Sequence, residues 1–417
     1  MSNQIDRDAQ GRSDASPPAG VRRPPLWSLI LITALSPFAL QVLVPAMPGL
    51  VDDFGSSRGV VGFSLTGYLL GMAVGQLACG PLSDRYGRRP VLFGGLVVFF
   101  VGSVFCLVAT DIWPLIAGRV LQALGASAGM VLSRAIVRDL YDRERAAQMI
   151  AYITAGMIVA PMAGPVVGGY LYELFGWQSV FWFVMAFGAV VTAACIAFVH
   201  ETHFDRGVTT SMGELWQGFG FLLRMRRFRG YALQVAFTTA SFYSFLGGAS
   251  AVTVDIFGQS ASDYGWWFVM ISGSYMTGNF ISGRIGMRVS SDKMITLGTT
   301  LSMTFAFALL VVTLSGSLTL PVFFLLSGVM SIGNGFSMPN GFAGAVSVDP
   351  TRAGTASGLS GALQTAIGAL LLTVVGYTLA DSPLPVVLMM LTGSVLAWFA
   401  HRHGMRRRGG CFFCLAS

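Results

Sequence analysis

The sequence is poor in charged residues. Asp, Glu, Lys and Arg make up 11% of its 417 residues, whereas 54% are hydrophobic and the mean hydropathy is +0.67. Soluble domains carry about 25% charged residues. Because a water-soluble core cannot absorb so many apolar side chains, the composition excludes an ordinary soluble protein. The net charge of +7 does not indicate nucleic-acid binding, since its distribution along the chain fits membrane orientation.

Cysteine and histidine are scarce as well. Cys79, Cys106 and Cys195 fall in apolar runs, where free thiols behave as small hydrophobes. Cys411 and Cys414 lie in the C-terminal tail, which formally fits a prenylation motif, although an anchored polytopic chain has no need of one. The four histidines lie only at the ends of the apolar runs. With no metal-ligand spacing, phosphate loop or nucleophile motif, the sequence predicts no metal, no cofactor and no enzymatic activity.

What the sequence has instead is long apolar runs. Residues 91–109 and 180–199 carry no acidic or basic side chain. A run of roughly 18 or more such residues predicts a membrane-spanning helix, since lipid offers the backbone no hydrogen-bond partners. A membrane β-barrel would show short alternating segments instead. Twelve spans are expected, at residues 26–48, 59–81, 91–109, 112–136, 146–171, 177–199, 229–251, 264–286, 293–314, 318–340, 352–379 and 383–401.

Lysine and arginine gather in alternate connections between these spans. The odd-numbered connections carry Arg58 alone among basic residues and are otherwise acidic. The even-numbered connections hold the remaining loop arginines, namely Arg85, Arg88, Arg89, Arg138, Arg143, Arg145, Arg206, Arg224, Arg226, Arg227, Arg229, Arg284, Arg288 and Arg352, together with Lys293. By the positive-inside rule, the even connections and both termini are expected in the cytoplasm.

The chain divides into two halves around its one long polar interruption. A weak repeat supports this division, because Asp, Arg and Ala recur at the same spacing in residues 142–146 and 349–353. The expected regions are a disordered cytoplasmic tail (1–25), an N-terminal six-helix bundle (26–199), a cytoplasmic linker (200–228), a C-terminal six-helix bundle (229–403) and a cytoplasmic tail (404–417). Within the linker, residues 212–223 fit either an amphipathic helix on the inner leaflet or a flexible connection. The fold class is therefore an all-α integral membrane protein of two six-helix bundles.

The sharpest local motif is residues 80–90, GPLSDRYGRRP. Read alone, it is a tight turn whose arginines fix orientation, but that does not explain an acid at the end of a span. It resembles the loop motif of the major facilitator superfamily, and this resemblance implies that Asp84 pairs with a helix N-terminus or arginine of the other half to latch an outward-facing state. The expected latch residues are Gly80, Asp84, Arg85, Gly87, Arg88 and Arg89.

Arg119 lies inside an apolar span, one turn before Gln122. An arginine at mid-membrane costs about 2.5–3.5 kcal/mol, so it should face the protein interior unless it reaches the membrane interface. The pair resembles the helix 4 motif of the same superfamily, in which the arginine is implicated in proton coupling. The resemblance therefore makes Arg119 and Asp84 the candidates for proton coupling.

The fifth span is rich in glycine and proline, which alone indicates kinking and close helix packing. The residues concerned are Gly156, Pro161, Gly164, Pro165, Gly168 and Gly169. The ending GPVVGG resembles the motif that distinguishes exporters from importers within the superfamily. This resemblance implies efflux.

Residues 36–48, SPFALQVLVPAMP, resemble the bicyclomycin and chloramphenicol-resistance branch of the drug:proton antiporters. The resemblance implies a monomer in the bacterial inner membrane, with protons and a small drug-like molecule as its transported partners. Many members carry an acid where this chain has Gln41. Since glutamine cannot carry a proton, the coupling acid lies elsewhere or the coupling differs, and neutral or zwitterionic substrates are favoured over cations.

A substrate cavity is expected near mid-membrane between the halves. Its candidates are Gln41, Tyr68, Gln122, Tyr152, Gln234, Tyr243, Tyr275, Asn279, Asn334 and Gln364, each of which could instead bond between helices. The alternatives to proton-coupled export are a metabolite uptake carrier or uniporter of the same fold, and a polytopic membrane transferase. A channel is disfavoured by the latch motif and the two halves.

Overall fold

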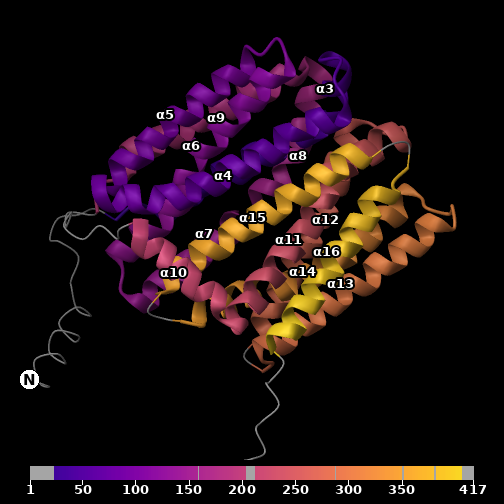
Figure 1. Cartoon of the computed structure of the whole chain (residues 1–417). Coiled ribbons are helices and arrows are strands. Elements are labelled where there is room, and N and C mark those ends of the chain that lie inside the picture. Colours follow the sequence, from indigo (N-terminus) through magenta and orange to yellow (C-terminus); the bar gives the residue numbers. More distant parts are fainter. Residues whose placement is uncertain are drawn as a thin grey trace, which may run out of the picture.

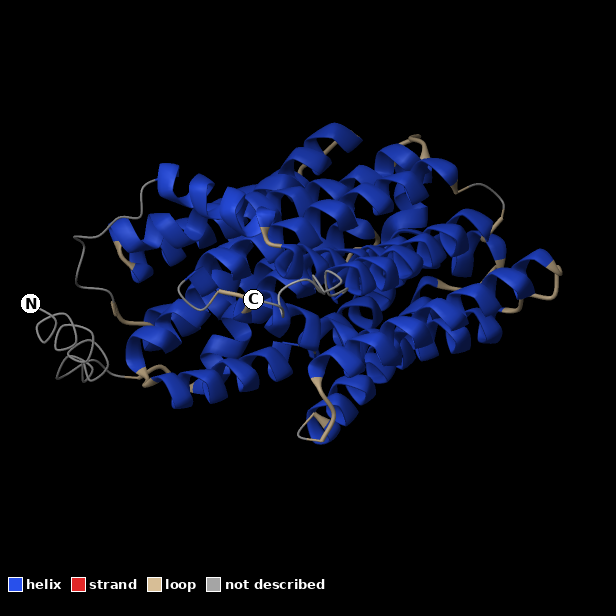
Figure 2. Ribbon diagram, turned by 60° about the horizontal axis from the view of Figure 1, so that its bottom comes forward, coloured by secondary structure: helices blue, strands red, loops and turns tan. Residues whose placement is uncertain are grey.

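The computed structural model describes residues 23–157, 159–202, 212–286, 288–349, 352–379 and 382–405. All regular structure in these ranges is helical (Figure 2). Residues 406–417 of the C-terminal tail, with Cys411 and Cys414, and all but three residues of the N-terminal tail (1–25) lie outside the described residues.

The first half contains the helices up to residue 198. These are α2 (Leu26–Gln41), η1 (Val44–Ala46), α3 (Met47–Asp53), α4 (Arg58–Tyr86), α5 (Arg88–Leu107), α6 (Ile112–Leu140), α7 (Arg143–Met157), α8 (Val159–Phe175) and α9 (Trp177–Phe198). Here α7 and α8 form the expected fifth span.

The second half contains α11 (Arg226–Ala251), η2 (Val252–Ile256), α12 (Ala261–Ile285), α13 (Ser291–Leu314), α14 (Leu320–Ser347), α15 (Ala353–Thr378) and α16 (Leu384–Met405). Across the described residues, 11 helical segments are long and apolar enough to cross a membrane. The more polar α12 is 25 residues long and supplies the twelfth expected span.

The first span differs from its prediction. A single helix was expected over 26–48, but α2 ends at Gln41 and the chain continues through η1 into α3. The reason is that Pro45 has no N–H to donate to the Gln41 carbonyl, and Pro48 has none for Val44. The α-helix is therefore interrupted at residues 42–46, within one candidate span, Leu26–Asp53, that contains the expected residues 26–48.

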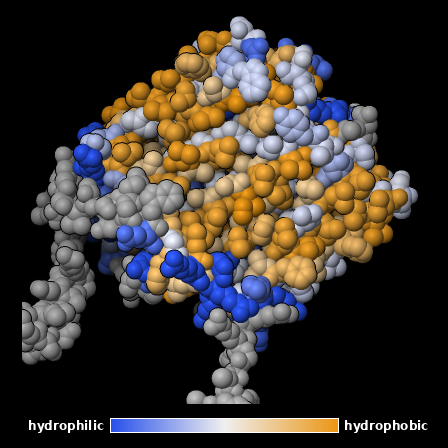
Figure 3. Space-filling view, in the orientation of Figure 1, coloured by the Kyte–Doolittle hydropathy of each residue, from blue (hydrophilic) through white to orange (hydrophobic). Residues whose placement is uncertain are grey.

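The two halves pack side by side (Figure 1). Two helix pairs join them, α4 with α15 and α8 with α12. One apolar cluster runs through both halves, and hydrophobic side chains cover much of the visible face between the two ends (Figure 3). Such an outer surface fits a protein whose solvent is lipid.

Charge distinguishes the two ends of the bundle. The end that carries the α4–α5 connection, Arg85 and the Arg224–Arg229 cluster is called the basic end. The opposite end, called the acidic end, carries Asp52, Glu173 and Asp255.

The linker between the halves includes a helix, α10 (Met212–Arg224), so the flexible reading of residues 212–223 is wrong. Leu222 of α10 is fully buried in a small apolar cluster with Phe228 and Ala356. The guanidinium carbon of Arg352 lies 4.1 Å from the centre of the Phe221 ring. This helix is therefore docked on the second half at the basic end.

Candidate functional site

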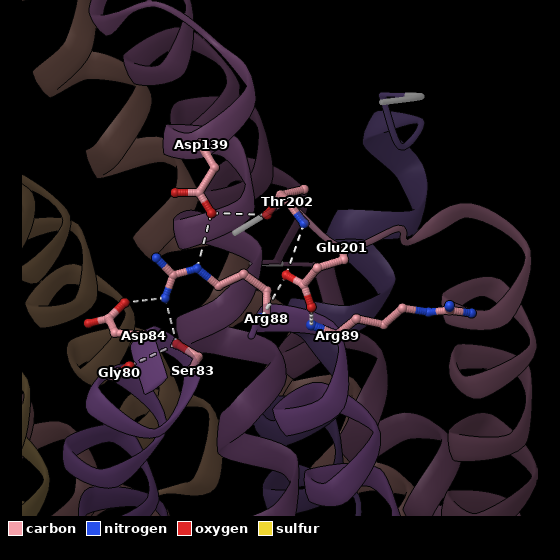
Figure 4. A network of polar contacts seen from close by, with 8 residues as sticks. All are labelled: Gly80, Ser83, Asp84, Arg88, Arg89, Asp139, Glu201 and Thr202. Atoms are coloured by element: carbon pink, nitrogen blue, oxygen red, sulfur yellow. Dashed lines mark hydrogen bonds and ion pairs between the residues drawn. The ribbon is translucent and has the colours of Figure 1, made fainter. Parts of the chain in front are cut away.

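A sharp turn joins α4 to α5 at the basic end. Gly87 adopts φ +100°, which only glycine tolerates well, and α5 begins at the next residue. The Glu201 carboxylate accepts the backbone N–H groups of Arg88 at 2.9 Å and Arg89 at 3.1 Å. Glu201, which follows α9, therefore caps the start of α5 and holds the turn in place (Figure 4).

Arg88 is the centre of this network. Its Nε lies 3.0 Å from Oδ2 of Asp139, and its Nη1 donates to the Asp84 carboxylate and to Ser83 Oγ. Asp139 also accepts from Thr202 Oγ1 at 2.9 Å. In this conformation Asp84 is thus bound within its own half (Figure 4), whereas the latch inferred from the motif joins it to the other half.

The sequence analysis did not single out Asp139, Glu201 or Thr202 as site residues. Each lies at the end of a helix or just beyond it, so apolar periodicity carries no signal for them. The usable signal was chemical. Glu201 is an acid directly after the sixth span, and the loop with Arg85, Arg88 and Arg89, which is expected on the same side of the membrane, needs anionic partners.

Arg119 is 0% exposed, so it does not reach the membrane interface. Its Nη1 donates to the Ala39 carbonyl at 2.9 Å and to Gln122 Oε1 at 2.6 Å. The Tyr68 ring lies over the guanidinium, 4.1 Å from its carbon. Among the described residues, Nε and Nη2 have no hydrogen-bond partner. Arg119 is therefore a buried cation held by neutral groups.

Two of the cavity candidates belong to this buried cluster. Gln122 donates to Ser103 Oγ at 2.8 Å, and Tyr68 donates to the Ser36 carbonyl at 2.9 Å. Both side chains are fully buried. In this conformation they bond between helices of the first half.

The glycines of α8 allow close contact with the first span. A Cβ on Gly168 would overlap the Val42 carbonyl oxygen, and a Cβ on Gly164 would lie 3.0 Å from the Cβ of Gln41. Earlier in the fifth span, a Cβ on Gly156 would lie 2.8 Å from Ile30. These glycines therefore face α2 and the turn that follows it.

The same span also contacts the other half. A Cβ on Gly169 would lie 2.7 Å from the Ala261 carbonyl oxygen, and one on Gly265 would lie 2.8 Å from that of Pro165. Pro161 and Pro165 lie within the same span. The motif residues thus place α8 between the first span and α12.

Polar contacts close the acidic end. Arg58 of α4 forms an ion pair with Asp255 of η2 at 3.1 Å, and Glu173 accepts the backbone N–H of Ser262 at 2.7 Å. Two further hydrogen bonds across the halves join Thr66 to Thr373 and Trp266 to Tyr170.

The helices that touch near the acidic end separate toward the basic end. A Cβ on Gly62 of α4 would lie 3.7 Å from the Cα of Gly376 on α15. Gly80 and Gly358 lie on the same faces of these helices about five turns further along. A Cβ on either would meet nothing within 4 Å. A Cβ on Gly361 would still lie 3.2 Å from Oε1 of Gln76, so α4 and α15 stay in contact as far as this pair and separate only beyond it, at Gly80 and Gly358.

The remaining cavity candidates are spread over both halves. Gln41, Gln234, Tyr243 and Asn334 are buried, Tyr275, Asn279 and Gln364 are half-buried, and Tyr152 is exposed. Asn334 accepts from Ser302 at 2.9 Å and Gln234 donates to Thr238 at 3.1 Å. The Oε1 atoms of Gln41 and Gln234 have no partner within the described ranges. These two oxygens are the clearest free polar groups of the set.

Two helical halves, joined at one end and parted at the other, define the class of secondary transporters that work by alternating access. The chain belongs to the Major Facilitator Superfamily, whose family model matches residues 29–373. It is accordingly a multi-pass membrane protein, and members of this family carry small molecules across the membrane.

Three bacterial relatives illustrate the similarity. The chain is 30% identical over 388 residues to an uncharacterised MFS-type transporter, YdgK, of Bacillus subtilis, covering 92% of this chain and 96% of that protein. It is 27% identical to a bicyclomycin resistance protein homolog of Haemophilus influenzae, covering 92% and 98%. It is 26% identical to multidrug resistance protein D of Escherichia coli, covering 81% and 85%.

Solved structures support the fold. A bacterial homolog of the lysosomal transporter Spinster, in an inward-facing and unoccupied conformation, gives a TM-score of 0.69 at 17% identity, covering 91% of this chain and 96% of that one. A D-xylose–proton symporter gives 0.70 at 15% identity, covering 89% and 96%.

Proposed function

We propose that this protein exports small drug-like molecules of the phenicol or bicyclomycin type across the bacterial inner membrane in exchange for protons. The observation that carries the proposal is the asymmetry of packing, with contact between Gly62 and Gly376 and none at Gly80 and Gly358. Such a molecule can present a central site to one side at a time. The relatives named for bicyclomycin and multidrug resistance support export as the direction.

The charge of the two ends supports an orientation. Positive charge favours the cytoplasmic side, so the basic end and both termini face the cytoplasm. In this orientation the structure is open to the cytoplasm and closed to the outside by the Arg58–Asp255 pair. Substrate then enters between the halves from the cytoplasm, and leaves after the acidic end opens.

Closure of the basic end requires Asp84 to change partner. We assign its second partner to the start of α15, where Arg352 lies between the Phe221 ring and Asp349. Exchange of Arg88 for this partner would join the halves at the cytoplasmic end. We assign proton coupling to Asp84, the acid that changes partner, and to Arg119, the fixed buried cation of the same half. This assignment needs no acid at position 41.

Everted membrane vesicles with an acidic lumen test this function. Chloramphenicol, a bicyclomycin-like compound and a cationic dye are added outside, and substrate uptake and luminal pH are followed together. Proton release that depends on chloramphenicol or another neutral compound is the expected result. Uptake with no proton movement would indicate a facilitator or another coupling ion, and loss of preloaded substrate would indicate an importer.

A further inference from the structure

Arg134 of α6 points away from the lipid-facing side of the first half. Gly125, nine residues earlier, packs on α5, where its Cβ would overlap the backbone of Gly95 and Phe99. At about 100° per residue, nine residues place Arg134 on the opposite face of α6. Helix α5 exposes Val97 and Val101 on its outer surface. Arg134 is therefore directed toward the inside of the transporter.

The contacts of α6 with α4 and α2 define more closely where Arg134 lies. Ser127 lies against Gly75 of α4, and Ser133 bonds to Thr33 of α2 at 2.7 Å. Arg134 follows Ser127 by seven residues, or about 20° around the helix, so it lies at the edge of the face that contacts α4 and away from α5. Arg134 precedes the last residue of α6, Leu140, by six residues. It therefore lies about 9 Å along the helix from the basic end.

Among the side chains that the structure describes, no carboxylate forms an ion pair with Arg134. The residue is half-buried, and its Nε is buried without a hydrogen-bond partner among the described residues. The nearby charge that Arg134 experiences is that of Arg138, which is also positive and therefore repels it. A cation in this position needs an anion, and a planar guanidinium binds a carboxylate through two parallel hydrogen bonds.

The interior of the described membrane helices also holds basic residues without acidic ones. Every Asp and Glu of the described membrane helices lies in a first or last turn or beyond it, as Asp84 and Asp139 do. Arg119 and Arg134, by contrast, lie inside α6. The interior of the transporter is therefore positive, which repels cations and attracts anions.

We propose that Arg134 binds a carboxylate of the substrate, so that the exported molecules include small organic molecules with an anionic group beside the neutral ones. This inference rests on the proposed export function and specifies its substrates. The open basic end gives Arg134 access to cytoplasmic substrate, whereas Arg119 stays behind the Tyr68 ring as a fixed background charge.

Matched neutral and anionic ligands test this assignment. The full-length protein in lipid nanodiscs is titrated with chloramphenicol and its succinate monoester, and with aromatic carboxylic acids and their primary amides. We expect at least one acid to bind about tenfold or more tightly than its neutral counterpart, as charge-assisted hydrogen bonds imply. The Arg134→Gln variant should lose this difference, and Arg134→Lys, which keeps the charge but not the two parallel hydrogen bonds, should keep only part of it.

Arg138→Gln is the matched control, because it removes an exposed arginine one turn away on the same helix. It should keep the preference for acids. Equal binding of acids and amides, binding of no acid, or an unchanged preference in Arg134→Gln would each overturn the proposal. Arg134-dependent binding of an acid with no proton-coupled export in vesicles would instead reject the export function and leave the binding site standing.

Discussion

At the scale of single residues, the basic-end network explains why one acid can serve two conformations. Asp84 is partly exposed and held by Arg88, which keeps a second carboxylate partner in Asp139. Loss of the Asp84 contact therefore leaves Arg88 paired. Asp84 can leave Arg88 without stranding a buried charge, as a partner exchange requires.

Asp84→Asn tests the latch directly. Asparagine keeps the size of the side chain but removes the charge, so the second conformation should lose its cross-half contact. We expect transport in vesicles to fall by about tenfold or more, as expected for loss of a charge-assisted contact of roughly 1.5–3 kcal/mol. Membrane content measured by immunoblot should stay at the wild-type level. Wild-type transport would refute the latch.

Asp111→Asn is a suitable control for this variant. Asp111 is an exposed acid at the opposite end that caps α6 through the Trp113 N–H, at 3.1 Å. Asparagine caps helices equally well. Its transport should therefore match the wild type.

Gln41 offers a second test at this scale. Its side chain is 3% exposed, and its Oε1 has no partner within the described ranges. A carboxylate at this position would offset the positive interior that Arg119 and Arg134 create. Gln41→Asp should therefore shift export toward cationic dyes relative to neutral phenicols, measured as a ratio of vesicle uptake rates. An unchanged ratio would place Gln41 outside the substrate path.

At the scale of helices, the first span and α8 depend on each other. The chain turns after Gln41 because prolines interrupt the backbone bonds, and the turn brings the Val42 carbonyl against Gly168. A bend in one helix thus requires a glycine in its neighbour. The exporter-like motif has a packing role here, whatever its effect on direction.

Gly168→Ala should disturb this contact. The added methyl has no room against the Val42 backbone, and overpacking typically costs about 1–3 kcal/mol. We expect a lower thermal unfolding midpoint of the purified protein. Gly94→Ala in α5 is the matched control, since its Cβ would meet nothing within 4 Å and alanine favours the helix. Equal midpoints for the two variants would contradict the packing argument.

At the scale of the whole molecule, the two pairs of glycines on α4 and α15 report which end is closed. In the structure the Gly62–Gly376 pair is in contact and the Gly80–Gly358 pair is apart. Alternating access predicts that these relations reverse when the protein opens to the other side.

Cysteine cross-linking measures this reversal. In a background with the five native cysteines replaced, a Gly62→Cys/Gly376→Cys pair should form a disulfide readily in the resting protein. A Gly80→Cys/Gly358→Cys pair should cross-link only when Arg58→Ala or Asp255→Ala weakens closure of the acidic end. The readout is mobility on a non-reducing gel. Equal cross-linking of both pairs in every background would argue against rocking halves.

The sequence by itself determined the spans, because a membrane helix is recognised from the apolar character of consecutive residues. Even α12, too polar for a hydropathy criterion, was predicted at residues 264–286 and observed at Ala261–Ile285. The motif at residues 80–90 also singled out the basic-end loop as a candidate site. These signals are local, so no knowledge of packing was needed to find them.

Only the tertiary structure decided which polar groups meet. Asp84, expected to reach across the halves in the outward-facing state, lies on Arg88 in this conformation, and Glu201 caps α5 from more than a hundred residues away in the chain. Gln122 and Tyr68, candidates for a cavity, instead surround Arg119. Apolar periodicity fixes which residues enter the membrane, but a buried polar side chain takes whichever partner the packing of distant helices provides.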